Sequence, residues 1–244
     1  MLTRAKPDAV LHPKRFYTDA APGAVEEGFG VLLDGRPVRT PAGAKLKLPS
    51  PALSQLLAAE WAGQGEHIVI GDMPATRLAF TAIDRAPVSR AEVADEIAKR
   101  AEADLLCYFA EQPDSLVERE VAHWAPMLDW AERELGLRLV RVLGHMHQPQ
   151  PEATLERVRA LALELSDFEL TGLVNAAGLF GSAVLAFALQ RDQLSGEEAF
   201  DLSRLDEAFQ EERWGVDEEA AHRTARMRHE AVVLEKWFRA LRSK

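Results

Sequence analysis

Apolar residues follow two different spacings along the chain, and the change between them divides it. Residues 14–49 carry short apolar runs interrupted by turn-forming residues, and Asp34-Gly35 is a strong hairpin signal. Ala44–Leu48 alternates apolar and polar positions, which is typical of a half-buried strand. The pattern therefore predicts a small antiparallel β unit. Its expected strands are Arg15–Thr18, Phe29–Leu33, Pro37–Thr40 and Ala44–Leu48.

The spacing becomes helical from residue 50 onward. Ser50 is a favourable N-cap and Pro51 suits the first helical position, so a helix is expected to begin there. His67–Ile70 could form a last strand, and from Ala75 the pattern predicts helix almost throughout, with Gly and Pro at most joints. The expected later elements are helices at Ser89–Ala101, Ser115–Leu135 ended by Gly136, Glu152–Leu165, Asp167–Ala177, Phe180–Arg191, Gly196–Arg213 and Val216–Leu241, with a β segment within Leu137–Leu143.

These elements predict an α+β fold with two domains. Residues 1–74 form a β-rich N-terminal domain and residues 75–244 an α-helical C-terminal domain. The uncharged segment Leu170–Leu189 is long enough to span a bilayer. Its glycines and Asn175, and the lack of a positively charged flank, favour instead two buried helices joined around Gly178–Gly181. We therefore expect no membrane insertion.

Composition and charge narrow the classes of partner. Of the 244 residues, 47% are hydrophobic and 28% charged, as in ordinary globular proteins, and the net charge is −10. An acidic chain is repelled by phosphate backbones, so we expect no nucleic-acid partner. Cys107 is the only cysteine, which excludes an internal disulfide, and its apolar neighbours predict a buried thiol. The N-terminus lacks the features of a secretory signal or an import sequence, which favours the bacterial cytoplasm.

The most informative segment is the acidic stretch from Leu205 to His222. Leu202, Leu205, Phe209 and Val216 share one helical face, while acidic residues crowd the others around Trp214-Gly215. An aromatic side chain framed by carboxylates is typical of a contact surface for a basic, partly apolar partner. The alternative is a solvated helix whose Trp214 packs on the core. The candidate partner-binding residues are Asp206, Glu207, Gln210, Glu211, Trp214, Asp217 and Glu218.

No motif for catalysis, metal or cofactor stands out. His145 and His147 could present two imidazoles on one strand face, but no third ligand is near and prolines follow. Glu211 and Glu212 are adjacent in a predicted helix, so they cannot converge on one atom as glycosidase carboxylates do. We therefore expect no enzyme, no catalytic residue, no metal and no cofactor. A hydrolase with a dispersed acidic site remains the alternative.

A series of blocks, in order and spacing, resembles one protein family. The blocks are Lys14–Tyr17, Leu33–Pro41, Glu60-Trp61 with Gln64, Met73-Pro74, Thr81–Asp84, Asp104–Tyr108, Trp124, Pro126 and Trp130, Leu202–Asp206, Phe209-Gln210 and Trp214-Gly215. Together they resemble the assembly-chaperone family for the α subunit of the F1 ATPase, found in mitochondria and alphaproteobacteria. The resemblance spans about residues 14–225.

The resemblance implies a β N-terminal unit, a helical C-terminal domain and a non-enzymatic role. It implies a monomeric chaperone that binds the free F1 α subunit and masks the apolar interface surface that would otherwise aggregate. The β subunit then replaces the chaperone without ATP hydrolysis. The family relies on acidic residues of its C-terminal domain, which correspond here to Asp206–Glu219, with Asp206 where relatives commonly carry glutamate. Trp61, Trp124 and Trp130 are expected in the core.

Overall fold

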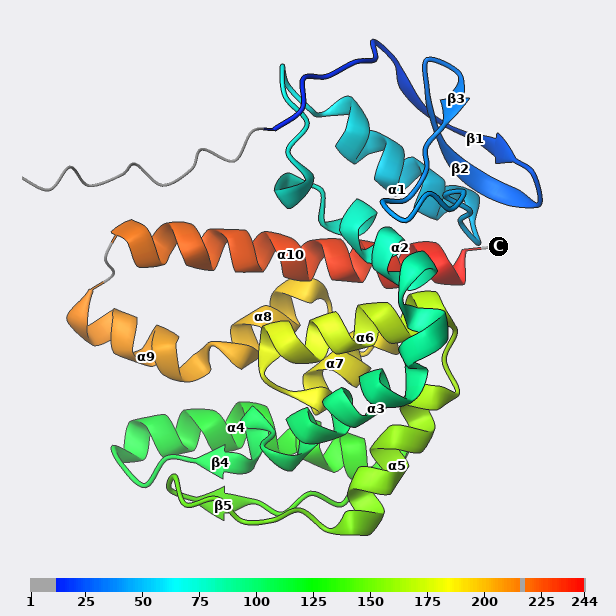
Figure 1. Ribbon diagram of the computed structural model, residues 1–244. Helices are drawn as coiled ribbons and strands as arrows, with labels where there is room; N and C mark the ends of the chain where they lie inside the picture. The colour runs from blue at the N-terminus through cyan, green and yellow to red at the C-terminus, as the bar shows by residue number, and fades with distance from the viewer. Residues whose placement is uncertain (1–11, 216–217, 244) are drawn as a thin grey trace, which may run out of the picture.

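The computed structural model describes residues 12–215 and 218–243 and has the α+β architecture that the sequence predicts (Figure 1). A three-stranded sheet and helix α1 (Pro51–Ala62) form one end of the molecule, and the remaining helices form a larger body. Helix α10 (Glu218–Arg242) passes between these two parts, and its C-terminal end lies beside α1.

The sheet has the order β1-β2-β3, with both pairs antiparallel. The predicted turn at Asp34-Gly35 is confirmed, because both residues have positive φ, 47° and 78°, and join the second and third strands. The Asp34 carboxylate also accepts hydrogen bonds from the backbone N–H groups of Thr18 and Asp19, so its role is structural. The strands are β1 (Ala20–Val25), β2 (Gly28–Leu33) and β3 (Arg36–Pro37).

The predicted strand boundaries need correction. β1 was not predicted, because it contains Pro22 and Gly23, residues that disfavour strands. The proposed strands at Ala44–Leu48 and His67–Ile70 appear only as isolated bridges, such as Lys14 with His67, and residues 15–18 form neither a strand nor a bridge. β1 pairs with β2 and packs on α1, and these contacts compensate for the low strand preference of its residues.

Helix α1 connects the sheet to the helical body. The Ser50 hydroxyl accepts a hydrogen bond from the Leu53 N–H at 3.1 Å, as expected for an N-cap, and donates one to the Ala240 carbonyl of α10 at 2.6 Å. The Ser54 hydroxyl donates to the Gly30 carbonyl of β2 at 2.6 Å. Buried hydroxyls with such partners satisfy polar groups at an otherwise apolar contact.

Two helices follow the N-terminal unit, α2 (Pro74–Asp84) and α3 (Ala86–Glu102), joined by the short connection at Arg85. Ser89 was expected to start a helix, but it lies at a kink inside α3 and its hydroxyl donates to the Arg85 carbonyl. The prediction of a helix start at Ser89 is therefore wrong, because α3 already begins at Ala86 with Pro87 in its first turn.

The predicted long helix over residues 115–135 is confirmed, with α4 at Asp114–Trp130 and a π-helical turn, η3, at Ala131–Leu135. It ends at Gly136, whose φ of 73° is the left-handed conformation that glycine adopts easily. The predicted β segment is reduced to β5 (Val142–Leu143), which pairs in parallel with β4 (Tyr108–Phe109). The short 3-10 helices are η1 (Ile70–Asp72) and η2 (Leu105–Cys107).

The centre of the helical body is the apolar segment that could be mistaken for a membrane span. It forms two helices that break at Gly181, with φ of 64°, and nearly all apolar side chains of α7 are buried. Within the described ranges, none of the helices combines the length and apolar character that a bilayer crossing requires. The remaining helices are α5 (Glu152–Leu163), α6 (Asp167–Phe180), α7 (Ala183–Gln190), α8 (Gly196–Ser203) and α9 (Leu205–Trp214).

Buried residues confirm most of the expected core. Trp61, Trp124 and Trp130 are all buried, and Cys107 is a buried thiol, as predicted. Asp104, one of the family-like positions, is fully buried and accepts hydrogen bonds from the N–H groups of Leu106 and Val184. It thereby ties the turn before β4 to the start of α7. Burial raises the pKa of Asp104 to about 6.

Candidate functional site

The predicted acidic site lies on a projecting part of the molecule. In the described chain, no residue between 210 and 230 is buried, and the first buried residue of α10 is Ala231. We call residues 210–215 and 218–230 the arm. Helix α9 and the N-terminal half of α10, which carry it, lie beyond α8 at the left of Figure 1. An exposed helical pair of this kind leaves its side chains available to a partner.

The root of the arm is fixed to α4. Leu205 and Phe209 are the buried residues of α9, and the guanidinium groups of Arg119 and Arg213 lie 5.2 and 4.1 Å from the Phe209 ring centroid. Arg119 also binds both carboxylate oxygens of Glu212, at 2.8 and 3.0 Å. Bidentate arginine–carboxylate pairs are geometrically specific, so this contact sets the orientation of α9 on the body.

The predicted site residues differ in whether they already form ion pairs within the protein. Glu207 and Glu211 both pair with Arg204, at 3.5 and 3.2 Å, so part of their charge is already balanced. Gln210 is exposed, and Glu218 is exposed in the first turn of α10. The sequence pattern predicted one acidic face, and the ion pairs with Arg204 could not be seen in it. Asp217, the remaining predicted residue, lies outside the described residues.

Trp214 is exposed, so the alternative in which it packs on the core is wrong. Its exposed fraction is 85%, among the highest of the large hydrophobic residues described. Helical geometry explains this, because five residues after Phe209 the helix has turned about 140° away from the buried face. Gly215, with φ of 82°, ends α9 directly afterwards. An isolated, solvated tryptophan at the end of an acidic helix is a suitable anchor for a protein partner.

Asp206 is half-buried rather than part of a fully solvated face, and it lies beside a second carboxyl group. Glu120 of α4 is completely buried, and its Oε2 accepts a hydrogen bond from the Ala110 N–H at 2.6 Å. Oε1 of Glu120 and Oδ1 of Asp206 are both buried, and apart from each other they have no hydrogen-bond partner. Burial, and then the hydrogen bond and charge of Asp206, raise the pKa of Glu120 to about 7. A proton shared between the two carboxyls would satisfy both oxygens.

Glu120 was not among the predicted site residues, although the sequence carries a signal for it. Leu116, Glu120 and Trp124 follow a spacing of four along α4, and all three are buried. A carboxylate in an apolar helical stripe is expected to be buried, with a raised pKa. Its partner could not be found this way, because Asp206 is distant in sequence.

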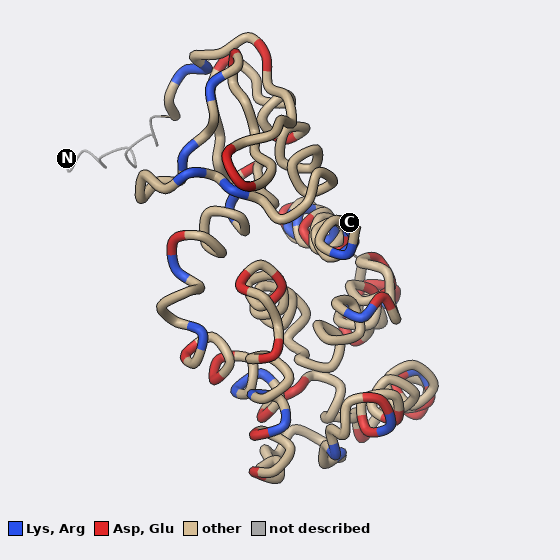
Figure 2. Tube along the Cα trace, turned by 90° about the vertical axis from the view of Figure 1, so that its right-hand side faces the viewer, with Lys and Arg blue, Asp and Glu red and all other residues tan. Residues whose placement is uncertain are grey.

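The two ends of the molecule also differ in charge. Positions 1–73 contain 8 Lys and Arg residues and 8 Asp and Glu residues, so the whole net charge of −10 falls on residues 74–244. Figure 2 shows the charged positions along the chain trace. The acidic character that favours a basic partner is therefore a property of the helical part.

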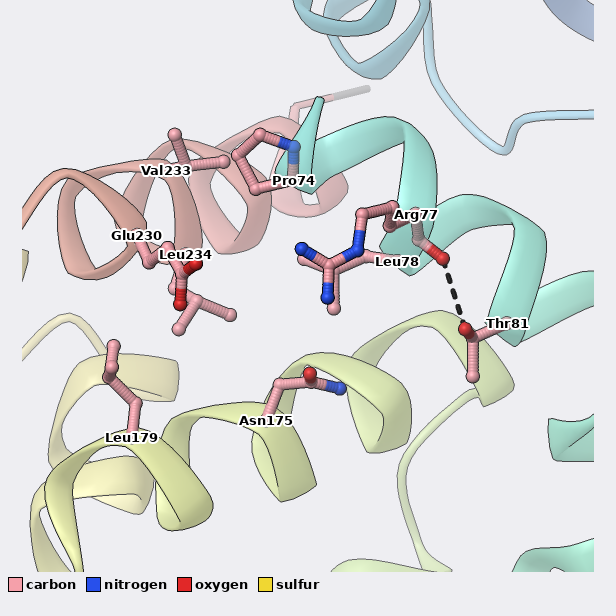
Figure 3. A pocket seen from close by; sticks show the side chains of 9 residues that line it. All are labelled: Pro74, Arg77, Leu78, Thr81, Asn175, Leu179, Glu230, Val233 and Leu234. Carbon is pink, nitrogen blue, oxygen red and sulfur yellow. Dashed lines mark hydrogen bonds between the residues drawn. The ribbon is translucent and has the colours of Figure 1, made fainter. Parts of the chain in front are cut away.

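The hydrolase alternative requires two carboxylates that converge where a substrate can reach them. A pocket between α2, α6 and α10 is lined by polar and apolar side chains, and Glu230 is its one lining carboxylate (Figure 3). The adjoining hollow on α6 is lined by Glu230 and by a second carboxylate, that of Glu96 on α3. The Glu120 and Asp206 carboxyls do converge, but Glu120 has no exposed surface for a substrate. Over residues 12–215 and 218–243, no three His, Cys, Asp or Glu side chains form a metal-binding group.

Known proteins resemble this chain over nearly its full length. The family model described as ATP12 chaperone protein matches residues 14–132. The mitochondrial protein atp12 of Schizosaccharomyces pombe is 24% identical over 219 residues, covering 85% of this chain and 75% of the yeast protein.

Solved structures show the same fold. The crystal structure of Atp12 from Paracoccus denitrificans is 36% identical, with a TM-score of 0.85 over 94% of this chain and 99% of the Paracoccus chain. A variant of that protein with one aspartate replaced by lysine matches equally well. A candidate chaperone from Agrobacterium tumefaciens is 40% identical, with a TM-score of 0.86 over 94% of this chain and 87% of its own.

Proposed function

This chain belongs to the ATP12 chaperone family of F1 ATPase assembly factors, and we propose that its client is the free F1 α subunit. In this proposal the chaperone covers the surface of the α subunit that later contacts β, which keeps the subunit from aggregating. The β subunit then displaces the chaperone by mass action, so no nucleotide is hydrolysed and no catalytic residue is required.

The exposed arm is the observation that carries this proposal. Solvent-exposed tryptophans are uncommon, and tryptophan is among the residues most often responsible for binding energy in protein interfaces. Trp214 stands at the tip of an acidic helix, in the part of the chain that holds the whole net negative charge. This combination supports a basic, partly apolar surface of the client as the binding partner.

Within the arm and its root, we assign three different roles to the predicted residues. Trp214, Gln210 and Glu218 contact the client directly. Glu207 and Glu211 form ion pairs with Arg204 in the free protein and bind a basic group of the client in the complex. Asp206 does not contact the client. Its carboxyl lies beside Glu120 and holds the root of α9 on α4, which positions the arm. Asp217 is assigned to the same surface on sequence grounds alone.

The experiment is a light-scattering assay with freshly diluted F1 α subunit and no ATP. A stoichiometric amount of the chaperone should suppress aggregation, whereas Trp214→Ala should suppress it poorly. Val88→Ala is a matched control, because Val88 is 88% exposed and lies on α3, away from the arm. Unchanged aggregation with the wild-type protein, under conditions where a general chaperone suppresses it, rejects the proposed function.

Three further proposals accompany this function. We propose that the protein acts as a monomer, and that it works in the bacterial cytoplasm. The domain boundary lies near residue 74, at the start of α2. The Glu60 carboxylate of α1 accepts hydrogen bonds from the Ala75 and Thr76 N–H groups there, at 2.7 and 2.8 Å, so the two domains are joined firmly. Limited proteolysis and light scattering of the purified protein test these points.

A further inference from the structure

A groove crosses helix α6 between the N-terminal helices and α10. Two neighbouring hollows share the lining residues Asn175, Leu179 and Glu230, and together they form this groove. One end reaches Arg77 on α2, and the other reaches Glu96 on α3. Figure 3 shows the first end, where Arg77 and Glu230 extend into the hollow from opposite walls above Asn175 and Leu179. The groove therefore opens onto the central helix of the body.

The floor of the groove is open at a glycine. Gly178 is exposed on α6, and a Cβ atom placed there would meet no other atom within 4 Å. Gly172, on the same helix, is different, because a Cβ there would lie 2.8 Å from Nε1 of Trp237. The chain thus uses one glycine of α6 for close packing and leaves the other facing empty space beside Leu179 and Met227.

The charged groups of the groove are not used within the protein. In the described chain, the side chains of Arg77, Glu96 and Glu230 form no hydrogen bond or ion pair. Glu96 of α3 and Glu230 of α10 both line the second hollow and are both acidic, so a cation between them would gain favourable electrostatic energy. Arg77 at the other end can donate hydrogen bonds to a carbonyl or carboxylate oxygen.

We propose that this groove receives an extended segment of the client, with an apolar side chain over Gly178 and a lysine or arginine between Glu96 and Glu230. The inference rests on the proposed chaperone function and deepens it by adding a second contact region. The groove is continuous with the arm, because Met227 and Glu230 belong to the arm portion of α10. A client that contacts Trp214 can therefore extend along α10 and reach the groove. The carbonyl groups of the segment face Arg77.

Gly178→Trp tests the groove by filling it. The substituted side chain enters empty space, and any residue is a better helix former than glycine except proline, so folding should be unimpaired. The affinity for the F1 α subunit, measured by titration, should fall at least about tenfold, as expected when one anchor site is blocked. Ala160→Trp is the control, because Ala160 is exposed on α5 and lines no part of the groove, and its affinity should match wild type.

The charges give a second, independent variant. Glu96→Lys combined with Glu230→Lys should weaken binding and make the residual affinity less sensitive to salt, because the attraction for a cation is replaced by repulsion. Retained affinity in both Gly178→Trp and the double charge variant, with normal melting, overturns the groove proposal. The same result follows if Gly178→Trp changes only the self-association of the chaperone, since the occupant is then a second copy of this chain. If the wild-type protein does not bind the α subunit at all, the proposed function itself fails.

Discussion

The two halves of α10 have the same secondary structure and opposite environments. From Glu218 to Glu230 no residue is buried, whereas from Ala231 onward Trp237 and Phe238 are among the most deeply buried side chains. One continuous helix therefore carries both a part of the core and the exposed arm. The inner half fixes the direction of the helix, and the outer half presents side chains at a distance from the body.

The inner half is held by close backbone contact as well as by apolar burial. Nε1 of Trp237 donates to the Phe168 carbonyl at 3.1 Å, and the two rings stack with centroids 5.8 Å apart. Gly196 of α8 lies directly against α10, since a Cβ there would approach the Ala231 carbonyl oxygen to 2.3 Å. The comparison indicates that stability resides in the inner half and partner binding in the outer half.

The largest loss of stability is expected when the inner tryptophan is removed. Trp237→Ala deletes a fully buried aromatic ring and leaves a cavity, which typically costs about 3–5 kcal/mol of unfolding free energy. Urea unfolding followed by circular dichroism measures this loss. The outer tryptophan is the matched control, because Trp214→Ala should change the unfolding free energy by about 0.5 kcal/mol or less. Similar losses in both variants would contradict the division between the halves.

A second prediction concerns the glycine beneath the inner half. Gly196→Ala places a methyl group against the backbone of α10 and forces the helices apart, which should destabilise the protein by about 1–3 kcal/mol. Gly178→Ala meets empty space and should be neutral or stabilising by up to about 1 kcal/mol, since glycine is unfavourable inside a helix. Thermal melts of the two variants distinguish close packing from open space. A stable Gly196→Ala protein would show that α10 is not held at this contact.

The outer half is tested by binding rather than by stability. Trp214→Ala should weaken binding of the F1 α subunit by about 2 kcal/mol, as for a hot-spot residue. Isothermal titration measures the change, with Val88→Ala as the exposed apolar control. Equal affinities of the two variants would show that the arm is not the principal client contact.

A fourth prediction uses the carboxyl pair at the root of the arm. Because the pKa of Glu120 is raised, the folded protein still holds a proton on this carboxyl at pH values where the unfolded chain has released it. The folded state therefore loses stability as pH rises from about 4.5 to about 7. Glu120→Gln removes this contribution. The variant should therefore lose less unfolding free energy than the wild type over that pH range, by on the order of 1 kcal/mol.

Urea midpoints at pH 5 and pH 8 measure that difference. Asp104 has its pKa raised in the same sense and remains in both proteins, so some loss of stability with rising pH persists in the variant. Glu118→Gln is the control, because Glu118 is exposed on the same helix and should retain the wild-type pH dependence. A Glu120→Gln profile that coincides with wild type would show that the two carboxyls do not share a proton.

The smallest expected effect is that of a single exposed charge. Glu218→Lys changes one fully exposed group of the arm, and such rim charges usually contribute about 0.2–1 kcal/mol. The variant should bind slightly more weakly, mainly through a slower association rate at low salt. Stopped-flow association at two salt concentrations resolves this change. An effect as large as that of Trp214→Ala would move the centre of the interface toward the start of α10.

Features that depend on neighbouring residues could be predicted from the sequence. The turn at Asp34-Gly35, the start of α1 at Ser50 and the helix end at Gly136 follow from backbone preferences that act over a few positions. The burial of most of Leu170–Leu189 follows from composition, because an uncharged stretch with glycines packs well inside a helical body. The family resemblance likewise needed only the order and spacing of its blocks.

The tertiary structure alone decided how the candidate site is arranged. Trp214 could have faced the core or the solvent, and only the seating of Phe209 on α4 directs it outward. Asp206 meets Glu120, and Arg77 meets the groove over α6, across long separations in sequence. Such contacts are set by how whole helices pack, and packing depends on side chains from several elements at once, so local patterns cannot specify them.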